Sequence, residues 1–365
     1  MLIIAALVFH APLKHTVTMG SYHPSSQNWW LRQSLYVGPS GMNYLPHFAI
    51  LFTPFDLLPL AVGEILWRFC AAATLATGLW FFSRELFSAK PEHAFLWATV
   101  LAMPLSLGAL RNGNANAIFG GVTLLAIVAI LRERWWLAIV WMALATALKP
   151  LGIVLLLLSS IYYLPAARRL PAAILALAIF PFFFGRPTYV ESQYHEAWRN
   201  LGACAVVTEN RFADFNGLLR TLGAPVPPKI STIVRALAGA ATALAWLWGA
   251  RRLQPALRAL WLYALTAGYL MLFNPMTETN SYVIFASALG IWGTYFLVDE
   301  DLARRRLGWT IAVMALSMPI LPNIFRPIFG NYFALVWFPA VTLVFLATLT
   351  AFAARPIDAK AQSSS

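Results

Sequence analysis

The stretch Trp261–Val298, WLYALTAGYLMLFNPMTETNSYVIFASALGIWGTYFLV, decides the fold. Its two apolar runs, Trp261–Phe273 and Val283–Val298, carry no charged side chain. Between them lies a short polar break, in which Pro275 ends the first helix. The pattern predicts two membrane helices joined by a polar turn. A carboxylate this close to hydrocarbon, that of Glu278, is costly and is usually retained for a pathway or a reaction.

The composition of the whole chain agrees with a membrane protein. Of its 365 residues, 60% are hydrophobic and only 11% are charged, and the mean hydropathy is +0.68. A soluble domain has about 25% charged residues. The net charge of +12 would suggest a nucleic-acid partner in a soluble protein, but in a membrane protein the positions of the charges matter more, and we expect no nucleic acid. Two cysteines, Cys70 and Cys204, imply neither a disulfide nor a metal framework.

Apolar runs follow one another along the chain and predict an all-α, polytopic transmembrane helical bundle of eleven or twelve spans. The predicted spans are residues 60–83, 94–110, 114–131, 135–149, 151–165, 170–185, 231–250, 256–273, 281–298, 307–324 and 332–353. Met1–Phe9 is about half a span, and we interpret it as a shortened first helix. Leu45–Leu60 is divided by prolines and is predicted to be re-entrant or interfacial. One integral membrane domain, 1–354, and a short cytoplasmic tail, 355–365, follow from this pattern.

The positions of the arginines predict the orientation. Most basic clusters fall on one side, the cytoplasm, if 135–149 and 151–165 cross separately; these clusters contain Arg84, Lys90, Arg132, Arg134, Arg168, Arg169, Arg251, Arg252, Arg258, Arg304, Arg305, Arg306, Arg355 and Lys360. The opposite, extracytoplasmic side then holds the outer loops 12–47 and 186–229 and the break at Glu278. The long polar loops on this side indicate that the function is performed there, in the plasma (inner) membrane of a cell.

Three further polar breaks on the outer side are candidates for binding an anion or a substrate. Arg111–Asn116, RNGNAN, offers Arg111, Asn114 and Asn116, although a capped turn is an alternative. Lys149, in ATALKPLG, can offset a phosphate charge or simply extend its ammonium to the interface. Asp214 and Asn216 begin the amphipathic segment Phe212–Arg220, where Asp214 is an N-cap or a base.

The polar residues around Glu278 have a structural alternative of their own. Thr277, Thr279, Asn280 and Ser281 are natural N-cap residues, and an acid near a helix N-terminus is stabilised by the helix dipole. A cap needs one such group, whereas this break has five. The six histidines lack the spacing of metal ligands, so we expect no metal and no cofactor.

Four segments resemble the polytopic glycosyltransferases of family 87, which include polyprenyl-phosphomannose-dependent mannosyltransferases. In order along the chain they are YLPHFAILFTPFDLLP (44–59), RNGNANAIFGG (111–121), ALATALKPLGIVLLLL (143–158) and FADFNGLLRTLG (212–223). The resemblance covers roughly residues 20 to 300 and implies a GT-C-like fold. It also implies transfer of a mannose-like hexose from a polyprenyl-phosphate sugar to a lipid or glycan acceptor at the outer face, among membrane lipids.

The chain departs from the family pattern at the presumed base. Family members carry an aspartate in the first outer loop, whereas residues 12–47 contain no acid, and Tyr22 and His23 stand near that place. We therefore expect Glu278 to be the base, with His23 as an alternative or auxiliary base.

We assign the binding of the phosphate and of the rest of the substrate to other residues on the outer side. We expect Arg111, Lys149 and Arg211 to serve the phosphate. The other candidate substrate-binding residues are Tyr22, Asn114, Asn116, Asp214, Asn216, Asn274 and Asn280. The competing hypotheses are a lipid or solute transporter and an inactive membrane scaffold; a transporter would have broken helices near mid-membrane and polar groups facing both sides.

Overall fold

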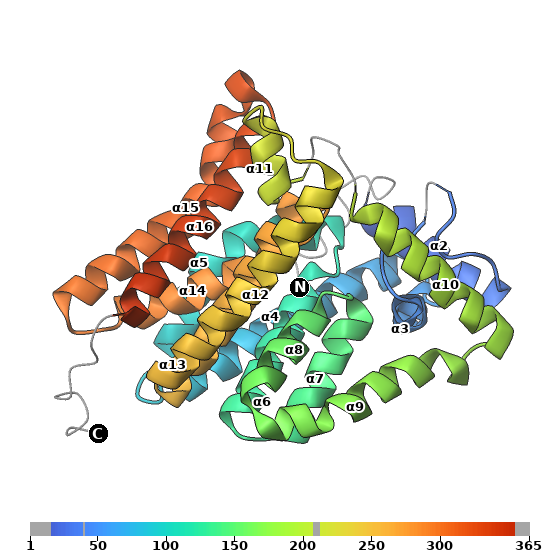
Figure 1. Ribbon diagram of the computed structural model, residues 1–365, viewed down its shortest axis with the longest axis horizontal. Helices are drawn as coiled ribbons and strands as arrows, with labels where there is room; N and C mark the ends of the chain where they lie inside the picture. Colours follow the sequence, from blue (N-terminus) through green and yellow to red (C-terminus); the bar gives the residue numbers. More distant parts are fainter. Residues whose placement is uncertain (1–15, 39–40, 207–211, 355–365) are drawn as a thin grey trace.

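The computed structural model describes residues 16–38, 41–206 and 212–354, and within these ranges the chain forms helices and no strands (Figure 1). Seven helices of the described chain are long and apolar enough to cross a membrane, and three shorter apolar helices accompany them. The prediction of an all-α, polytopic membrane bundle is confirmed. The predicted half-span Met1–Phe9 and the predicted tail 355–365 lie outside the described residues.

Each predicted span corresponds to a helix. These helices are α4 (Leu60–Leu86), α5 (Pro91–Asn112), α6 (Asn116–Leu131), α7 (Trp135–Leu148), α8 (Gly152–Tyr162), α9 (Leu164–Ile179), α12 (Pro228–Arg252), α13 (Pro255–Phe273), α14 (Val283–Leu297), α15 (Leu302–Phe329) and α16 (Tyr332–Ala354). Several begin earlier than predicted, and the shifts are largest for α9 and α15, so that Arg168 and Arg304 lie inside these helices rather than in breaks. The long aliphatic stem of an arginine lets its charge reach water from the end of a membrane helix.

The region 135–165 consists of two helices, as the distribution of arginines requires. α7 ends at Leu148, the following Lys149 has an extended backbone, and α8 begins at Gly152. The two helices pack against each other, and both pack against α9. With 14 and 11 residues they are about 21 and 16 Å long, shorter than a hydrocarbon core of about 30 Å.

α4 and α6 cross closely in the bundle interior. A Cβ atom on Gly121 would lie 2.4 Å from the backbone carbon of Thr74, and one on Gly78 would lie 2.8 Å from the carbonyl oxygen of Gly121. Only glycine allows two helix backbones to approach this closely, as is common between membrane helices. The crossing fixes α6, and therefore the break that precedes it, relative to α4.

The two ends of the bundle differ in character. At one end, toward the lower left of Figure 1, lie the turns α4–α5, α6–α7, α8–α9 and α12–α13. There Arg132 donates to Glu85 (Nε to Oε1, 2.8 Å), and the guanidinium of Arg258 lies 5.0 Å from the ring centroid of Tyr162. The polar breaks gather at the opposite end. The predicted alternation of basic and polar turns is therefore present in the fold.

A layer of shorter helices covers the polar end. It contains η2 (Thr18–Tyr22), α2 (His23–Leu31), α3 (Pro46–Asp56), η3 (Phe180–Phe183), α10 (Pro187–Cys204), α11 (Phe215–Thr221) and η4 (Thr279–Tyr282). The predicted outer loops are thus largely helical. They are joined because the Leu35 amide donates to Gln193 Oε1 (3.0 Å) and Asn200 Nδ2 donates to the Met42 carbonyl (3.0 Å). α10 lies over α2 and α3 at the right of Figure 1.

Candidate functional site

Asn116 and Lys149 form the centre of a buried polar cluster. Asn116 is the first residue of α6, and Lys149 follows α7. Lys149 Nζ donates to Asn116 Oδ1, while Asn116 Nδ2 donates to the Ser281 hydroxyl (3.2 Å) and to the Asn280 carbonyl (3.4 Å). Three breaks that are distant in the sequence therefore meet through one amide.

Tyr22 and Tyr44 connect the first outer segment to this cluster. The two hydroxyls are 3.0 Å apart, and the Tyr22 hydroxyl accepts from the Ala115 amide (3.1 Å). The Lys149 ammonium lies 5.1 Å from the centroid of the Tyr44 ring, in a cation–π arrangement. Tyr22 has no exposed surface and Lys149 is 8% exposed, so the cluster is largely dry.

Glu278 faces the cluster and is not used as a helix cap. It occupies the N-cap position of η4, but its side chain accepts no capping hydrogen bond, and α14 likewise has no side-chain cap. The Thr277 hydroxyl instead donates to the Asn274 carbonyl (2.9 Å), and Ser281 accepts from Asn116. None of these side chains therefore forms a capping hydrogen bond to η4 or α14 within the described chain. Within the described chain the half-buried Glu278 carboxylate has no hydrogen-bond partner.

The ionisation of the cluster follows from its burial and from the charge of Glu278. Burial lowers the pKa of Lys149 to about 8, although the negative charge of Glu278 opposes this shift. Burial also raises the pKa of Tyr44 to about 12, with a further increase from Glu278. The tyrosines are therefore neutral hydrogen-bonding groups at neutral pH, and Lys149 is a cation that loses its charge in mildly alkaline solution.

A second network beside the cluster surrounds His23. His23 Nδ1 lies 2.6 Å from Asp56 Oδ1, and Nε2 lies 3.0 Å from Glu64 Oε1. Glu64 also pairs with Arg68 and accepts from the Thr18 hydroxyl (2.9 Å). Burial alone would lower the pKa of His23, but the hydrogen bonds to Glu64 and Asp56 outweigh it, and the pKa is raised. Because both ring nitrogens face carboxylates, the protonated ring has no free lone pair with which to act as a base.

Asp56, Glu64 and Arg68 are missing from the candidates obtained from the sequence. Glu64 and Arg68 occur in LAVGEILWRFC, inside an apolar run, and are 0% and 1% exposed. Their i, i+4 spacing places them on one helix face, and intramembrane charges of opposite sign usually pair. The i, i+4 spacing of Glu64 and Arg68 could therefore have indicated a buried ion pair from the sequence alone. Arg68 also donates to the Arg111 carbonyl (3.1 Å), which ties this network to the break that contains Asn116.

Other candidate residues have local roles. Asn114 Oδ1 accepts from the Asn116 amide (3.0 Å), while the side chain of Arg111 is exposed and forms no hydrogen bond within the described chain. Asn274 Nδ2 donates to the Thr277 hydroxyl (3.1 Å). These residues lie at the same end of the bundle as the cluster. Among them, only Asn114 forms a hydrogen bond to a residue of the cluster, Asn116.

The segment 212–216 packs against the break at Glu278 but does not enter the cluster. The Ala213 amide donates to the Thr277 carbonyl (2.7 Å). Asp214 caps α11 by accepting from the Gly217 amide (2.7 Å), and burial raises its pKa. Asn216 Nδ2 donates to the Ser231 hydroxyl (2.6 Å). Arg211 lies outside the described residues.

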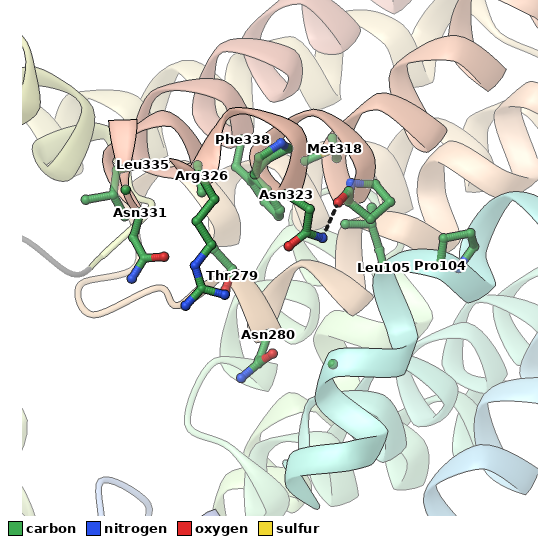
Figure 2. Close-up of a pocket in the computed structure, with 15 residues that line it drawn as sticks. Pro104, Leu105, Thr279, Asn280, Met318, Asn323, Arg326, Asn331, Leu335 and Phe338 are labelled. Carbon is green, nitrogen blue, oxygen red and sulfur yellow. Dashed lines mark hydrogen bonds between the residues drawn. The ribbon is translucent and has the colours of Figure 1, made fainter. Parts of the chain in front are cut away.

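A pocket of about 420 Å³ opens on the other side of η4, between α5, α15 and α16. Its polar lining residues are Thr279, Asn280, Asn323, Arg326 and Asn331, and its apolar lining includes Leu105, Met318, Leu335 and Phe338. Figure 2 shows Arg326 extending from α15 toward Thr279 and Asn280. In the residues that the structure describes, no group of three or more His, Cys, Asp or Glu side chains could hold a metal ion.

Comparison with known proteins yields one match. A sequence model of glycosyltransferase family 87 matches residues 43–275, which is more than half of the chain. No curated protein and no solved structure matches. The matched segment contains Asn116 and Lys149 and ends shortly before Glu278.

Proposed function

Because this chain belongs to glycosyltransferase family 87 and is a multi-pass membrane protein, we propose that it takes a mannose-like hexose from a polyprenyl-phosphate sugar. The acceptor is a hydroxyl of a lipid or glycan, and transfer takes place at the extracytoplasmic face of the cell membrane. The observation that carries the proposal is the meeting of Glu278, Lys149, Asn116 and Tyr22 at the end of the bundle opposite the basic turns.

The reaction needs one group that accepts a proton. The acceptor oxygen bonds to the anomeric carbon, the bond from that carbon to the phosphate oxygen breaks, and the acceptor proton moves to a base. Glu278 suits this role because its carboxylate is half-buried and free of hydrogen bonds within the described chain. His23 suits it less, because Asp56 and Glu64 occupy both of its ring nitrogens. We assign His23 to the positioning of these two carboxylates.

The reaction also needs a cation for the phosphate that leaves. The Lys149 ammonium has three donors, and one of them is committed to Asn116. A preorganised cation in a dry site stabilises a developing negative charge more strongly than it would in water. Lys149 therefore binds the phosphate and Asn116 fixes the direction of its ammonium. Arg111, exposed at the same end, is placed to attract the anionic donor from solution.

The orientation in the membrane rests on the charges of the turns. The turns at the far end of the bundle carry the clustered arginines, and such turns face the cytoplasm in most membrane proteins. The cluster then faces outward, where lipid-linked sugars are the available donors because nucleotide sugars are cytoplasmic.

A substitution of Glu278 tests the proposal. Glu278→Gln keeps the size and the hydrogen-bonding capacity of the side chain and removes the base, so we expect the turnover number to fall about 10²–10⁴-fold. The measurement is mass spectrometry of the products formed by purified protein from polyprenyl-phosphate hexoses and membrane lipids. Donor supplied only to the outside of right-side-out vesicles should also support transfer.

The matched control is Glu191→Gln on α10, an exposed acid of the outer layer that lies away from the cluster. We expect this variant to retain wild-type activity. Full activity of Glu278→Gln would remove the residue from the role of base. Transfer from nucleotide sugars, with none from lipid-linked sugars, would overturn the proposed donor class.

A further inference from the structure

The pocket between α5, η4, α15 and α16 is separate from the buried cluster. η4 forms the wall between them: the Asn280 carbonyl accepts from Asn116 in the cluster, while the Asn280 side chain lines the pocket. The Asn280 amide oxygen also lies so close to α5 that a Cβ atom on Gly108 would be 2.7 Å from it. The pocket is therefore a candidate binding site distinct from the cluster.

The lining of the pocket carries one charge, and that charge is positive. Arg326 is the only charged residue among those that line the pocket in the described chain, and no described acid pairs with its guanidinium. Amide and hydroxyl groups of Asn280, Asn331 and Thr279 stand beside it. A guanidinium with neutral hydrogen-bonding neighbours suits a phosphate group, which it can bind through two parallel hydrogen bonds.

The position of the pocket along the membrane normal suits a lipid, whose headgroup lies at the interface and whose chains lie deeper. Arg326 lies in the last turn of α15, a candidate membrane span, and Asn331 lies in the turn to α16. Met318 lies eight residues before Arg326, about 12 Å along the helix toward the middle of the membrane. Together with Leu105 and Phe338 it gives the deeper part of the pocket an apolar lining. Arg326 at the interface can therefore meet the headgroup of a lipid, and the apolar part of the pocket can hold part of its chains.

An arginine in the last turn of a helix also interacts favourably with the helix dipole. That effect explains the residue type, but it explains neither the pocket beneath the guanidinium nor the absence of acids from its described lining. Asn323 donates to the Pro319 carbonyl (2.8 Å), whereas the guanidinium of Arg326 is exposed and has no hydrogen-bond partner within the described chain.

We propose that this pocket binds the phosphate group of a membrane lipid, with Arg326 as its cation and Asn331 and Asn280 as neutral partners. Apart from its α5 wall, the site lies in elements that follow the segment matched by the family model. Binding does not depend on the proposed transfer reaction, because it is measured without turnover.

The test is lipid binding by the purified full chain in nanodiscs or detergent. The probes are undecaprenyl phosphate, phosphatidylglycerol and inorganic phosphate, and the readout is the dissociation constant from native mass spectrometry or from a fluorescence titration. We expect Arg326→Gln to weaken binding of the preferred lipid about tenfold or more, since a charge-assisted hydrogen bond is lost. Arg326→Lys keeps the charge but loses the two parallel hydrogen bonds, so it should weaken binding less than Arg326→Gln does. Asn331→Trp, which fills the mouth of the pocket, should weaken binding as well.

Arg199→Gln on α10 is the matched control, because it removes an exposed outer arginine that does not line the pocket. Equal affinity of Arg326→Gln and wild type, or an equal loss in Arg199→Gln, would overturn the proposal. If inorganic phosphate bound as tightly as both lipids, the proposal that a lipid occupies the pocket would be refuted. Glu278→Gln should leave this binding unchanged, so failure of the proposed transfer reaction is distinguished from failure of this inference.

Discussion

Replacement of Lys149 by methionine should separate catalysis from folding. The ammonium donates once, to Asn116, and its other two donors are free to meet a phosphate. Loss of one preorganised donor to a developing negative charge typically lowers the turnover number about 10²–10³-fold. Burial already disfavours the charged lysine, since it lowers the pKa to about 8, so methionine relieves a cost of the folded state. This relief opposes the loss of the hydrogen bond to Asn116, and we expect the unfolding temperature to stay near that of the wild type.

The assay measures the turnover number and the Michaelis constant for the lipid-linked donor as functions of pH. Lysine is charged below its pKa, so phosphate binding by the wild type should be complete below about pH 8 and should weaken as the pH rises through that value. Lys149→Arg stays charged throughout this range, and its activity, although lower, should not show the alkaline decline. Activity of Lys149→Met within threefold of wild type, in a normally folded protein, would refute the assignment. So would an alkaline decline that persists unchanged in Lys149→Arg.

Two further substitutions test the structural supports of the site. Arg68→Met breaks a buried ion pair and should lower the free energy of unfolding by about 3–5 kcal/mol, measured by denaturation in detergent; an effect below 1 kcal/mol would contradict the buried network. Gly121→Ala should destabilise the protein by about 1–3 kcal/mol, because its new Cβ would lie 2.4 Å from the backbone of α4. Gly120→Ala is the control, since its Cβ would lie 3.7 Å from Leu75, an ordinary contact; equal stability of the two variants would exclude a tight crossing.

The membrane helices could be predicted because each apolar run is bounded by charged or proline-rich breaks. The separation of α7 from α8 came from the alternation of basic turns, not from hydropathy, which allows one long helix as well. The helical layer at the outer end could not be predicted with the same detail. α2 has little apolar periodicity, and α10 is amphipathic but too polar to resemble a membrane span. Long-range hydrogen bonds such as that from the Leu35 amide to Gln193 hold the two helices together.

The residues of the cluster could be predicted in part because they, too, are polar breaks in apolar runs. Glu278, Lys149 and Asn116 are polar interruptions of apolar runs, and interruptions at the same end of antiparallel helices lie at the same depth. The sequence contains no sign that a single amide, that of Asn116, joins them. Glu64 and Arg68 escaped notice because they lie within a span, and the histidine that links Glu64 to Asp56 comes from a segment whose fold is set by tertiary contacts.

The distribution of the cluster along the chain has a consequence for biosynthesis. Ribosomes deliver the N-terminal part first, at about 5–20 residues per second, so Glu278 emerges roughly 6–26 s after Lys149. Until η4 reaches the membrane, Asn116 lacks its contacts with Ser281 and Asn280, and the buried ammonium lacks its nearby carboxylate. A chain that stalls after α12 therefore holds the cation without the proposed base. A partly inserted chain that lacks η4 has an incomplete cluster, and we expect activity only after η4 has reached the bilayer.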